Sequence, residues 1–460
     1  MDEPLLCWIF LLLAIAWGSC TRSQQTQEAL KRRCGMLTPL VQWYNVTFVL
    51  LFLLFLRTLM DIFKFEYIQD RFLSWEVYSE TLDPSKTGIP LSPAELDTAH
   101  GPLVIPSWIR FLSLASPIAG VVAFGYSAYQ VVSGILFGTN VADAETPGER
   151  FLHMVVRGMP LVYIVMALRA TIRQWAVMTG SCWLPYAHVE MTLAERQQTW
   201  KYLKAAEIST YTQDLEVASG FQFFAVWCFG QVCSKALRRV LFEEGLRLAN
   251  SFNQQAEPME TDTNTVSRDG TILLQLGILG LHSFVILGVV KTVFNMIIAM
   301  CSANWKLEAM VEPFQQVFLQ TFDPVFVFAT ILSVINMLLL GKMEMVEKVL
   351  PNVNMKFNAT RALLLIGQGQ LTVLRAATTD GDTHTSKFLS MLHKIPFAPF
   401  NHMEWWFDMN QARLVHSSLL CFECLAVVIF NDKMWTNKRQ AQAREAAEEG
   451  DPRRAPLLDC

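Results

Sequence analysis

The chain has 460 residues, of which 52% are hydrophobic and only 17% are charged. Soluble domains carry about 25% charged residues, so the composition favours a membrane protein. The formal net charge of −4 argues against a nucleic-acid-binding protein. The ten cysteines form neither a CxxC…CxxC zinc pattern nor a dense disulfide framework, and we expect no metal and no cofactor.

The N-terminal part of the chain holds two apolar runs before a polar segment. Residues 1–20 contain an apolar core followed by small residues, which is typical of a signal peptide, although no positive charge precedes it. They are therefore either a signal peptide or a first anchor helix. Residues 39–56 predict an additional N-terminal span. Residues 57–107 are rich in Trp, Tyr, Asp, Glu and Pro and predict an extramembrane loop.

Seven further apolar runs approach the length of about 20 residues that a membrane-spanning helix needs. These runs are 108–137, 152–174, 215–235, 272–301, 318–341, 357–376 and 412–430. Long continuous runs favour helices over a β-barrel, whose strands alternate in polarity. The predicted fold class is therefore all-α: a polytopic transmembrane helical bundle with a seven-helix core at 108–430 and one or two extra N-terminal hydrophobic helices.

The polar segments between the runs set the expected orientation. Residues 251–270 carry Pro and Gly and predict a flexible loop, and residues 302–317 predict a short loop. The segment 236–250 and the tail 431–460 are the most basic, and positive charge gathers on the cytoplasmic side of membrane proteins. The sequence thus predicts a multi-pass protein of the plasma membrane or an endomembrane, with a basic cytoplasmic C-terminus.

The run at 353–376 contains unusually polar residues for a membrane helix. Arg361, Gln368 and Gln370 stand among leucines, and Lys356 opens the segment. A cation deep in a spanning helix costs roughly 2.5–3.5 kcal/mol and usually faces the bundle interior or a wet cavity. Arg361 and Gln368 are seven residues apart and share a helical face. This helix is therefore expected to form one wall of a polar path.

Other predicted spans also carry ionisable residues. Arg157, Arg169, Lys291 and Glu423 join Arg361, which gives four basic groups and one acidic group. A cavity with excess positive charge favours an anionic ligand, because a fixed charge acts strongly in a low dielectric. For Arg157 and Arg169 the alternative is that they extend from the helix ends to lipid headgroups.

Several polar residues around these charges have more than one expected role. Asn295 lies four residues after Lys291 and is expected to orient it. Glu423 either neutralises Lys291 or Arg361 in a structural ion pair or takes part in transport. His416 lies seven residues before Glu423 on the same face, so the two could relay protons, whereas a structural histidine is the commoner case.

Cysteine pairs and enzyme motifs add little. Cys421 and Cys424 are one helical turn apart, but no further metal ligands are evident near them, so a packing role is expected. No HExxH, GxSxG or P-loop pattern occurs, and we do not expect an enzyme.

Residues 356–370 resemble the sixth helix of the organic solute transporter alpha-subunit family, which includes the transmembrane protein 184 relatives. That helix has Lys-Phe, a Lys five residues after the first Lys and a Gln fourteen after it. Here Lys356-Phe357, Arg361 and Gln370 stand at these offsets, with Arg in place of Lys. Cys421-Phe422-Glu423 is similar to the Cys-x-Glu of the last family helix, and Lys291 to the intramembrane Lys of the fourth.

The resemblance implies a seven-helix bundle that takes part in facilitated movement of amphipathic organic anions, such as steroid or bile-acid conjugates. It also implies a single-span beta-type subunit as partner. Apart from the resemblance, we expect membrane lipids and a further copy of the chain in a homo-oligomer as partners, and no nucleic acid. The residues predicted to line the substrate path are Lys291, Asn295, Lys356, Arg361, Gln368, Gln370, His416 and Glu423. The alternative is a receptor-like or scaffolding seven-helix protein in endomembrane trafficking or signalling, with no solute flux.

Overall fold

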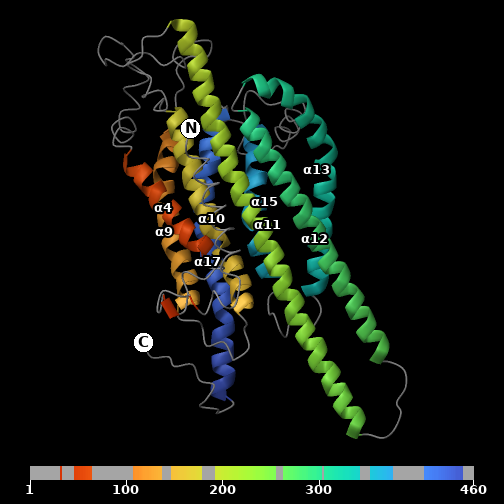
Figure 1. Ribbon diagram of the computed structural model, residues 1–460. Coiled ribbons are helices and arrows are strands. Elements are labelled where there is room, and N and C mark those ends of the chain that lie inside the picture. The colour runs from red at the N-terminus through yellow and green to blue at the C-terminus, as the bar shows by residue number, and fades with distance from the viewer. Residues whose placement is uncertain are drawn as a thin grey trace, which may run out of the picture.

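A computed structural model describes residues 29, 32–33, 46–64, 107–136, 147–178, 192–254, 263–302, 305–341, 353–376 and 409–448. Regular secondary structure within these residues is entirely helical, as Figure 1 shows, so the all-α prediction is confirmed for this part of the chain. The long helices are α4 (Val46–Lys64), α9 (Ser107–Leu136), α10 (Pro147–Met178), α11 (Leu193–Gln254), α12 (Thr263–Ser302), α13 (Trp305–Gly341), α15 (Val353–Ala376) and α17 (Met409–Glu448).

Five segments of the described residues are long and apolar enough to cross a membrane. They are Ser107–Ser133, Leu152–Met178, Lys201–Lys235, Leu279–Cys301 and Met409–Met434. The predicted spans 318–341 and 357–376 are helical too, but α13 holds only the shorter apolar stretch Pro324–Asn336 and α15 is not among the five. The helices therefore indicate a multi-pass membrane protein. That its core has seven spans stays a prediction.

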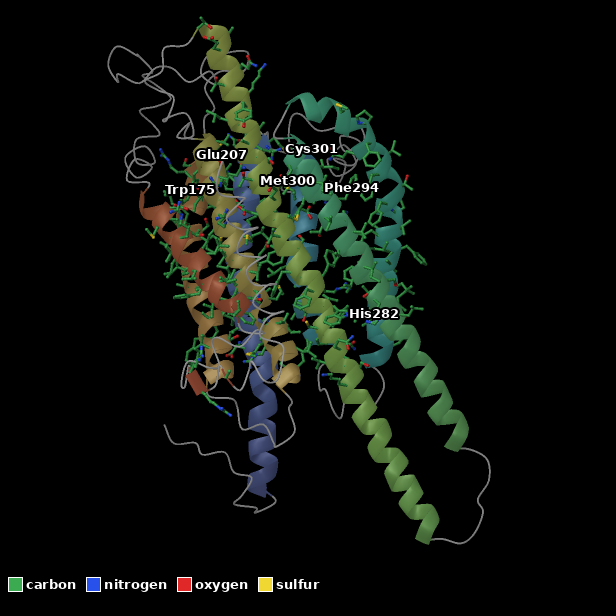
Figure 2. All side chains as sticks on the ribbon, viewed as in Figure 1. Trp175, Glu207, His282, Phe294, Met300 and Cys301 are labelled. Atoms are coloured by element: carbon green, nitrogen blue, oxygen red, sulfur yellow. The ribbon has the colours of Figure 1, made fainter. Side chains whose placement is uncertain are left out.

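Neighbouring helices run antiparallel, as cross-helix contacts show. Arg169 and Arg173 of α10 meet Asp214 and Glu207 of α11 in reverse order along the chain. In Figure 2, Glu207 lies toward the end of the bundle where α12 finishes with Cys301, and His282 lies toward the opposite end of α12. The C-terminal extensions of α11 and α17 project from the same end of the bundle (Figure 1). This agrees with the shared side predicted for the two basic segments.

Helix α10 is the centre of the bundle. It packs against α4, α9, α11, α15 and α17, and almost every residue between Leu152 and Met178 is buried. A helix that is apolar all round belongs in a core, which explains why this one shows no amphipathic stripe. Helix α4 docks on it by placing the ring of Phe48 against Gly158, where a Cβ would leave no room.

Helices α12 and α13 form the outer edge of the bundle. They pack against each other and α12 packs against α11, and the ring of Phe294 of α12 is stacked on that of Phe318 of α13. Their other faces expose large apolar side chains such as Ile286 and Phe328. Acyl chains are the natural cover for such a face in a membrane protein, because a soluble monomer rarely exposes so large an apolar patch.

The predicted loops are wrong at several helix ends. The basic segment 236–250 belongs to α11, which continues to Gln254, and α12 begins at Thr263 inside the predicted loop 251–270. The predicted loop 302–317 is replaced by the start of α13 at Trp305. An apolar run shows only which part of a helix lies in lipid. A helix makes its backbone hydrogen bonds within itself, so it can continue beyond the membrane into water. For the same reason α4 extends past residue 56 to Lys64, and α17 reaches Glu448 in the tail 431–460.

The remaining N-terminal predictions lie mostly outside the described residues. These are the signal peptide or anchor at 1–20, the start of the span 39–56, and residues 65–106 of the predicted extramembrane loop.

Local signals explain where α11 starts. Thr192 and Glu195 form a capping box, in which the Thr192 backbone and hydroxyl groups each donate to Glu195 Oε2 at 2.8 Å. The hydrogen bond from the Thr192 backbone, and then that from its hydroxyl, hold the pKa of the Glu195 carboxyl below its ordinary value. The cap thus opens a helix of 62 residues well before its apolar part.

Tight packing between α11 and α12 gives a test of the fold. A Cβ at Gly288 would overlap the buried ring of Phe223, whereas nothing lies within 4 Å of a Cβ at Gly125 of α9. We expect Gly288→Ala to destabilise the protein by about 1–3 kcal/mol through overpacking. Gly125→Ala should be neutral or stabilise by up to about 1 kcal/mol, because Ala is the better helix former. Unfolding of the two variants in detergent measures both effects; equal stabilities would contradict this helix interface.

Candidate functional site

Helix α15, which carries half of the predicted site residues, lies between α11 and α17. Gln222 of α11 donates to the backbone oxygen of Thr360 at 2.7 Å, and the Phe229 and Phe357 rings lie 5.9 Å apart. The opposite face of α15 exposes apolar side chains such as Val373. One face of α15 is therefore fastened to the bundle, and the other is open to lipid.

Arg361 is buried and has no carboxylate partner within the described helices. Its side chain belongs to a residue only 8% exposed, and its guanidinium carbon lies 5.1 Å from the centre of the Phe357 ring. Its Nε and Nη1 atoms have no hydrogen-bond partner among the described residues. The ring beneath it supplies a cation–π contact, which does not satisfy the N–H donors. The prediction that Arg361 turns into the bundle rather than to headgroups fits this geometry.

Two arginines of α10 do have carboxylate partners. Arg169 Nε donates to Asp214 Oδ1 at 3.0 Å, with both side chains 6% exposed, and Arg173 Nη1 lies 3.4 Å from Glu207 Oε2. The alternative that Arg169 extends to headgroups is therefore wrong. The predicted balance of four basic groups to one acidic group is also wrong, because it left out the acids of α11.

The missed acids had a signal in the sequence. Asp214 directly precedes the run 215–235, and the helix that crosses the membrane begins earlier, at Lys201. Starting the span at the first continuous apolar residue therefore excluded the carboxylate that neutralises Arg169. Arg157, the other arginine considered, is half-buried on α10.

His416 is held at both ring nitrogens. Its Nδ1 lies 2.9 Å from the Tyr211 hydroxyl of α11, and its Nε2 lies 2.8 Å from the Gly367 carbonyl oxygen of α15. The residue is buried, and both partners tie α17 to neighbouring helices. The carbonyl can only accept, so Nε2 carries the proton and Nδ1 accepts from Tyr211. This favours a structural histidine over a His416–Glu423 proton relay.

Glu423 meets Gln370 across the α15–α17 interface. Gln370 Nε2 donates a short hydrogen bond to Glu423 Oε1. The other carboxylate oxygen, Oε2, and the amide oxygen of Gln370 are buried without a hydrogen-bond partner in the described part of the chain. The described contacts of Glu423 thus give no support to an ion pair with Lys291 or Arg361.

Lys291 and Asn295 lie at the interfaces of α12. The Lys291 ammonium is 4.8 Å from the centre of the Phe326 ring of α13, and the side chain is half-buried. Asn295 Nδ2 donates to Glu216 Oε1 of α11 at 2.9 Å. The expectation that Asn295 mainly orients Lys291 therefore misses its link to α11.

The remaining predicted residues lie along α15. Lys356 is buried near the start of the helix. Gln368 belongs to the helix, but its side chain lies outside the described residues.

An open groove lies between α15 and α17. It has a volume of about 400 Å³ and is lined by Ile366, Gly369, Gln370, Val373, Leu374 and Leu419. Of the predicted path residues, this groove includes Gln370 but not Lys291 or Arg361. Arg361 and Gln370 are nine residues apart, which places them on opposite faces of a helix with 3.6 residues per turn. The groove and the Arg361 guanidinium are thus separate features.

The described residues form no metal-binding site. No group of three His, Cys, Asp or Glu side chains gathers there, and Cys421 and Cys424 are fully buried in the apolar core.

Comparison of the chain with protein-family models, with curated proteins and with solved structures finds no match. The resemblance of residues 356–370 to a transporter family therefore remains a prediction.

Loss of one carboxylate tests the ion pair between α10 and α11. Asp214→Asn removes the charge of the carboxylate that accepts from the buried Arg169 guanidinium, and we expect it to destabilise the protein by about 3–5 kcal/mol. Glu207→Gln is the matched control, since its ion pair with Arg173 is longer and partly exposed, and it should cost less. Unfolding of both variants in lipid nanodiscs is the measurement. Equal losses, or no loss in Asp214→Asn, would show that the buried pair does not stabilise the bundle.

Proposed function

We propose that the chain is a multi-pass membrane protein that binds and moves an amphipathic organic anion, with Arg361 of α15 as the anion-binding group. A single observation supports this most strongly: Arg361 is buried and has no carboxylate partner among the described residues, whereas Arg169 and Arg173 each have one. Removing a charge from water without a partner is costly, so such a residue is retained where something else supplies the opposite charge.

The surroundings of Arg361 suit an amphipathic ligand. Its guanidinium rests on Phe357, whose ring in turn neighbours Phe229 of α11. A sulfate or carboxylate can accept two N–H donors from a guanidinium, and the rings offer an apolar wall for the rest of the molecule. Lys291 of α12, which is half-buried, places its ammonium 4.8 Å from the centre of the Phe326 ring of α13 and is a further cation within a predicted span. The predicted seven-helix architecture and the transporter-like pattern at 356–370 favour movement of the anion over mere binding.

Binding and flux of a steroid sulfate test this function. Purified protein in nanodiscs should bind the labelled compound, and proteoliposomes should take it up. Arg361→Gln removes the charge and should lower both by at least tenfold, while Arg361→Lys should retain part of the binding. Arg57→Gln is the control, because Arg57 is an exposed arginine of α4 that pairs with Asp61.

Measuring binding as well as flux separates the role of Arg361 from any need for a single-span partner subunit. If Arg361→Gln binds the sulfate as tightly as the unaltered chain, Arg361 is not the anion-binding group. If neither chain binds it, the proposed function fails.

A receptor-like or scaffolding role is the second candidate, and the tail favours it. Helix α17 continues past the end of its candidate span at Met434 to Glu448 and projects from the bundle (Figure 1). Its sequence there carries Lys438, Arg439 and Arg444. On this hypothesis the full chain recruits a cytosolic protein that a chain ending at residue 434 does not, and neither chain supports solute flux. Flux that is unaffected by the truncation would contradict it.

A further inference from the structure

The α15–α17 groove lies one helical turn from a carboxyl group, that of Glu423, which has no counter-charge among the described residues. Leu419 lines the groove, and Glu423 follows it by one turn on the same face of α17. Glu423 accepts a hydrogen bond from Gln370, which itself lines the groove, and it forms no ion pair with any described residue. A negatively charged group thus stands beside an apolar hollow that faces lipid.

Two buried acceptors at this place need donors. Glu423 Oε2 and Gln370 Oε1 both lack a hydrogen-bond partner in the part of the chain that the structure describes. A buried acceptor without a donor costs roughly 1–3 kcal/mol, and more when it is charged. Because the two side chains are hydrogen-bonded to each other, their two remaining oxygens lie close together and form one small polar site. A single group with at least two N–H donors and a positive charge would satisfy the charge and both oxygens.

The rest of the groove is apolar. Ile366, Val373, Leu374 and Leu419 supply hydrocarbon, and residues 366–374 cover about 12 Å of helix at 1.5 Å per residue. A metal ion would have only these two oxygens as ligands, because the other side chains that line the groove are apolar. A phospholipid headgroup would bring a phosphate to mid-membrane depth, because Glu423 lies near the middle of the span Met409–Met434. The groove therefore suits a compact apolar body.

We propose that this groove binds an amphipathic amine: a protonated primary ammonium on a compact, rigid apolar body, with the ammonium donating to Glu423 Oε2 and Gln370 Oε1. The ligand enters from the lipid side, where Ile366 and Val373 are exposed. The site lies on the face of α15 opposite Arg361 and takes a ligand of opposite charge. It therefore goes beyond the proposed anion transport and is tested independently of it.

Three adamantane compounds that differ only in their polar group test the proposal. The protein is placed in phosphatidylcholine nanodiscs, and binding of labelled 1-adamantanamine is measured by equilibrium dialysis against protein-free discs. Competition with unlabelled 1-adamantanol and 1-adamantanecarboxylate separates a charged donor from a neutral hydroxyl and from an anion. We expect saturable amine binding that the alcohol and the carboxylate displace at least tenfold less well than unlabelled amine. Equal displacement by the alcohol would overturn the assignment of a cation, and absence of saturable binding would overturn the site.

Two variants place the amine in the groove. Glu423→Gln keeps the shape and removes the charge, and it should weaken amine binding at least tenfold. Gly369→Leu should abolish binding, since a Cβ at Gly369 meets nothing within 4 Å and the larger side chain fills the groove. Gly125→Leu is its matched control, an equally open glycine on α9 that should bind like the unaltered chain.

Each variant is first compared with the unaltered chain by gel filtration and thermal unfolding. If Glu423→Gln does not fold, the pair Gly369→Leu and Gly125→Leu decides the question. Unchanged binding in Gly369→Leu, or equal loss in both glycine variants, would show that the amine binds elsewhere or not at all.

Discussion

Polar side chains at membrane depth have no water to bond with, and the bundle depends on how each of them finds a partner on a neighbouring helix. The clearest case is Arg169 of α10 with Asp214 of α11, both almost fully buried. Asn295 joins α12 to α11 through Glu216, and His416 joins α17 to α11 and α15. Because apolar packing alone distinguishes poorly between lipid and protein, these specific bonds determine which helix faces lie together.

The same constraint makes the exceptions informative. Arg361, Glu423 and Gln370 are among the polar residues of α15 and α17 that the described neighbours leave partly unsatisfied, together with Asn354 and Ser418. The first three lie on two faces of α15, a cation on one and acceptors on the other. The predicted single polar path thus becomes two distinct places of opposite charge. Helix α15 is fastened to the bundle at Thr360 and Gly367, so neither place can close simply by rotation of the helix.

Much of the fold was predictable because it depends on local composition. Apolar runs of about 20 residues locate helices regardless of their neighbours, and all seven core runs are helical in the structure. Helix ends were not predictable in this way, since the polar parts of α11 and α12 continue beyond their apolar segments. The capping box at Thr192 and Glu195 was a usable signal for one of these ends.

The site was only partly predictable, because spacing shows which residues share a helix face but not what that face meets. The sequence identified Arg361, Gln370 and Glu423 as unusual, and the structure joins the last two. The sequence alone could not show that Arg169 is neutralised, since its partner, Asp214, lies 45 residues away on another helix. Nor could it show that Tyr211 and Gly367 hold His416, because neither residue is unusual in its own segment.

The central position of α10 has a consequence for how the protein is made. Helices enter the membrane in the order of synthesis, so α10 emerges with Arg169 and Arg173 before their carboxylates on α11 exist. Moving a single helix with unpaired arginines into lipid costs free energy. The two helices therefore have to leave the insertion machinery as a hairpin, with their charges already matched, and the later helices then assemble on that hairpin as a template.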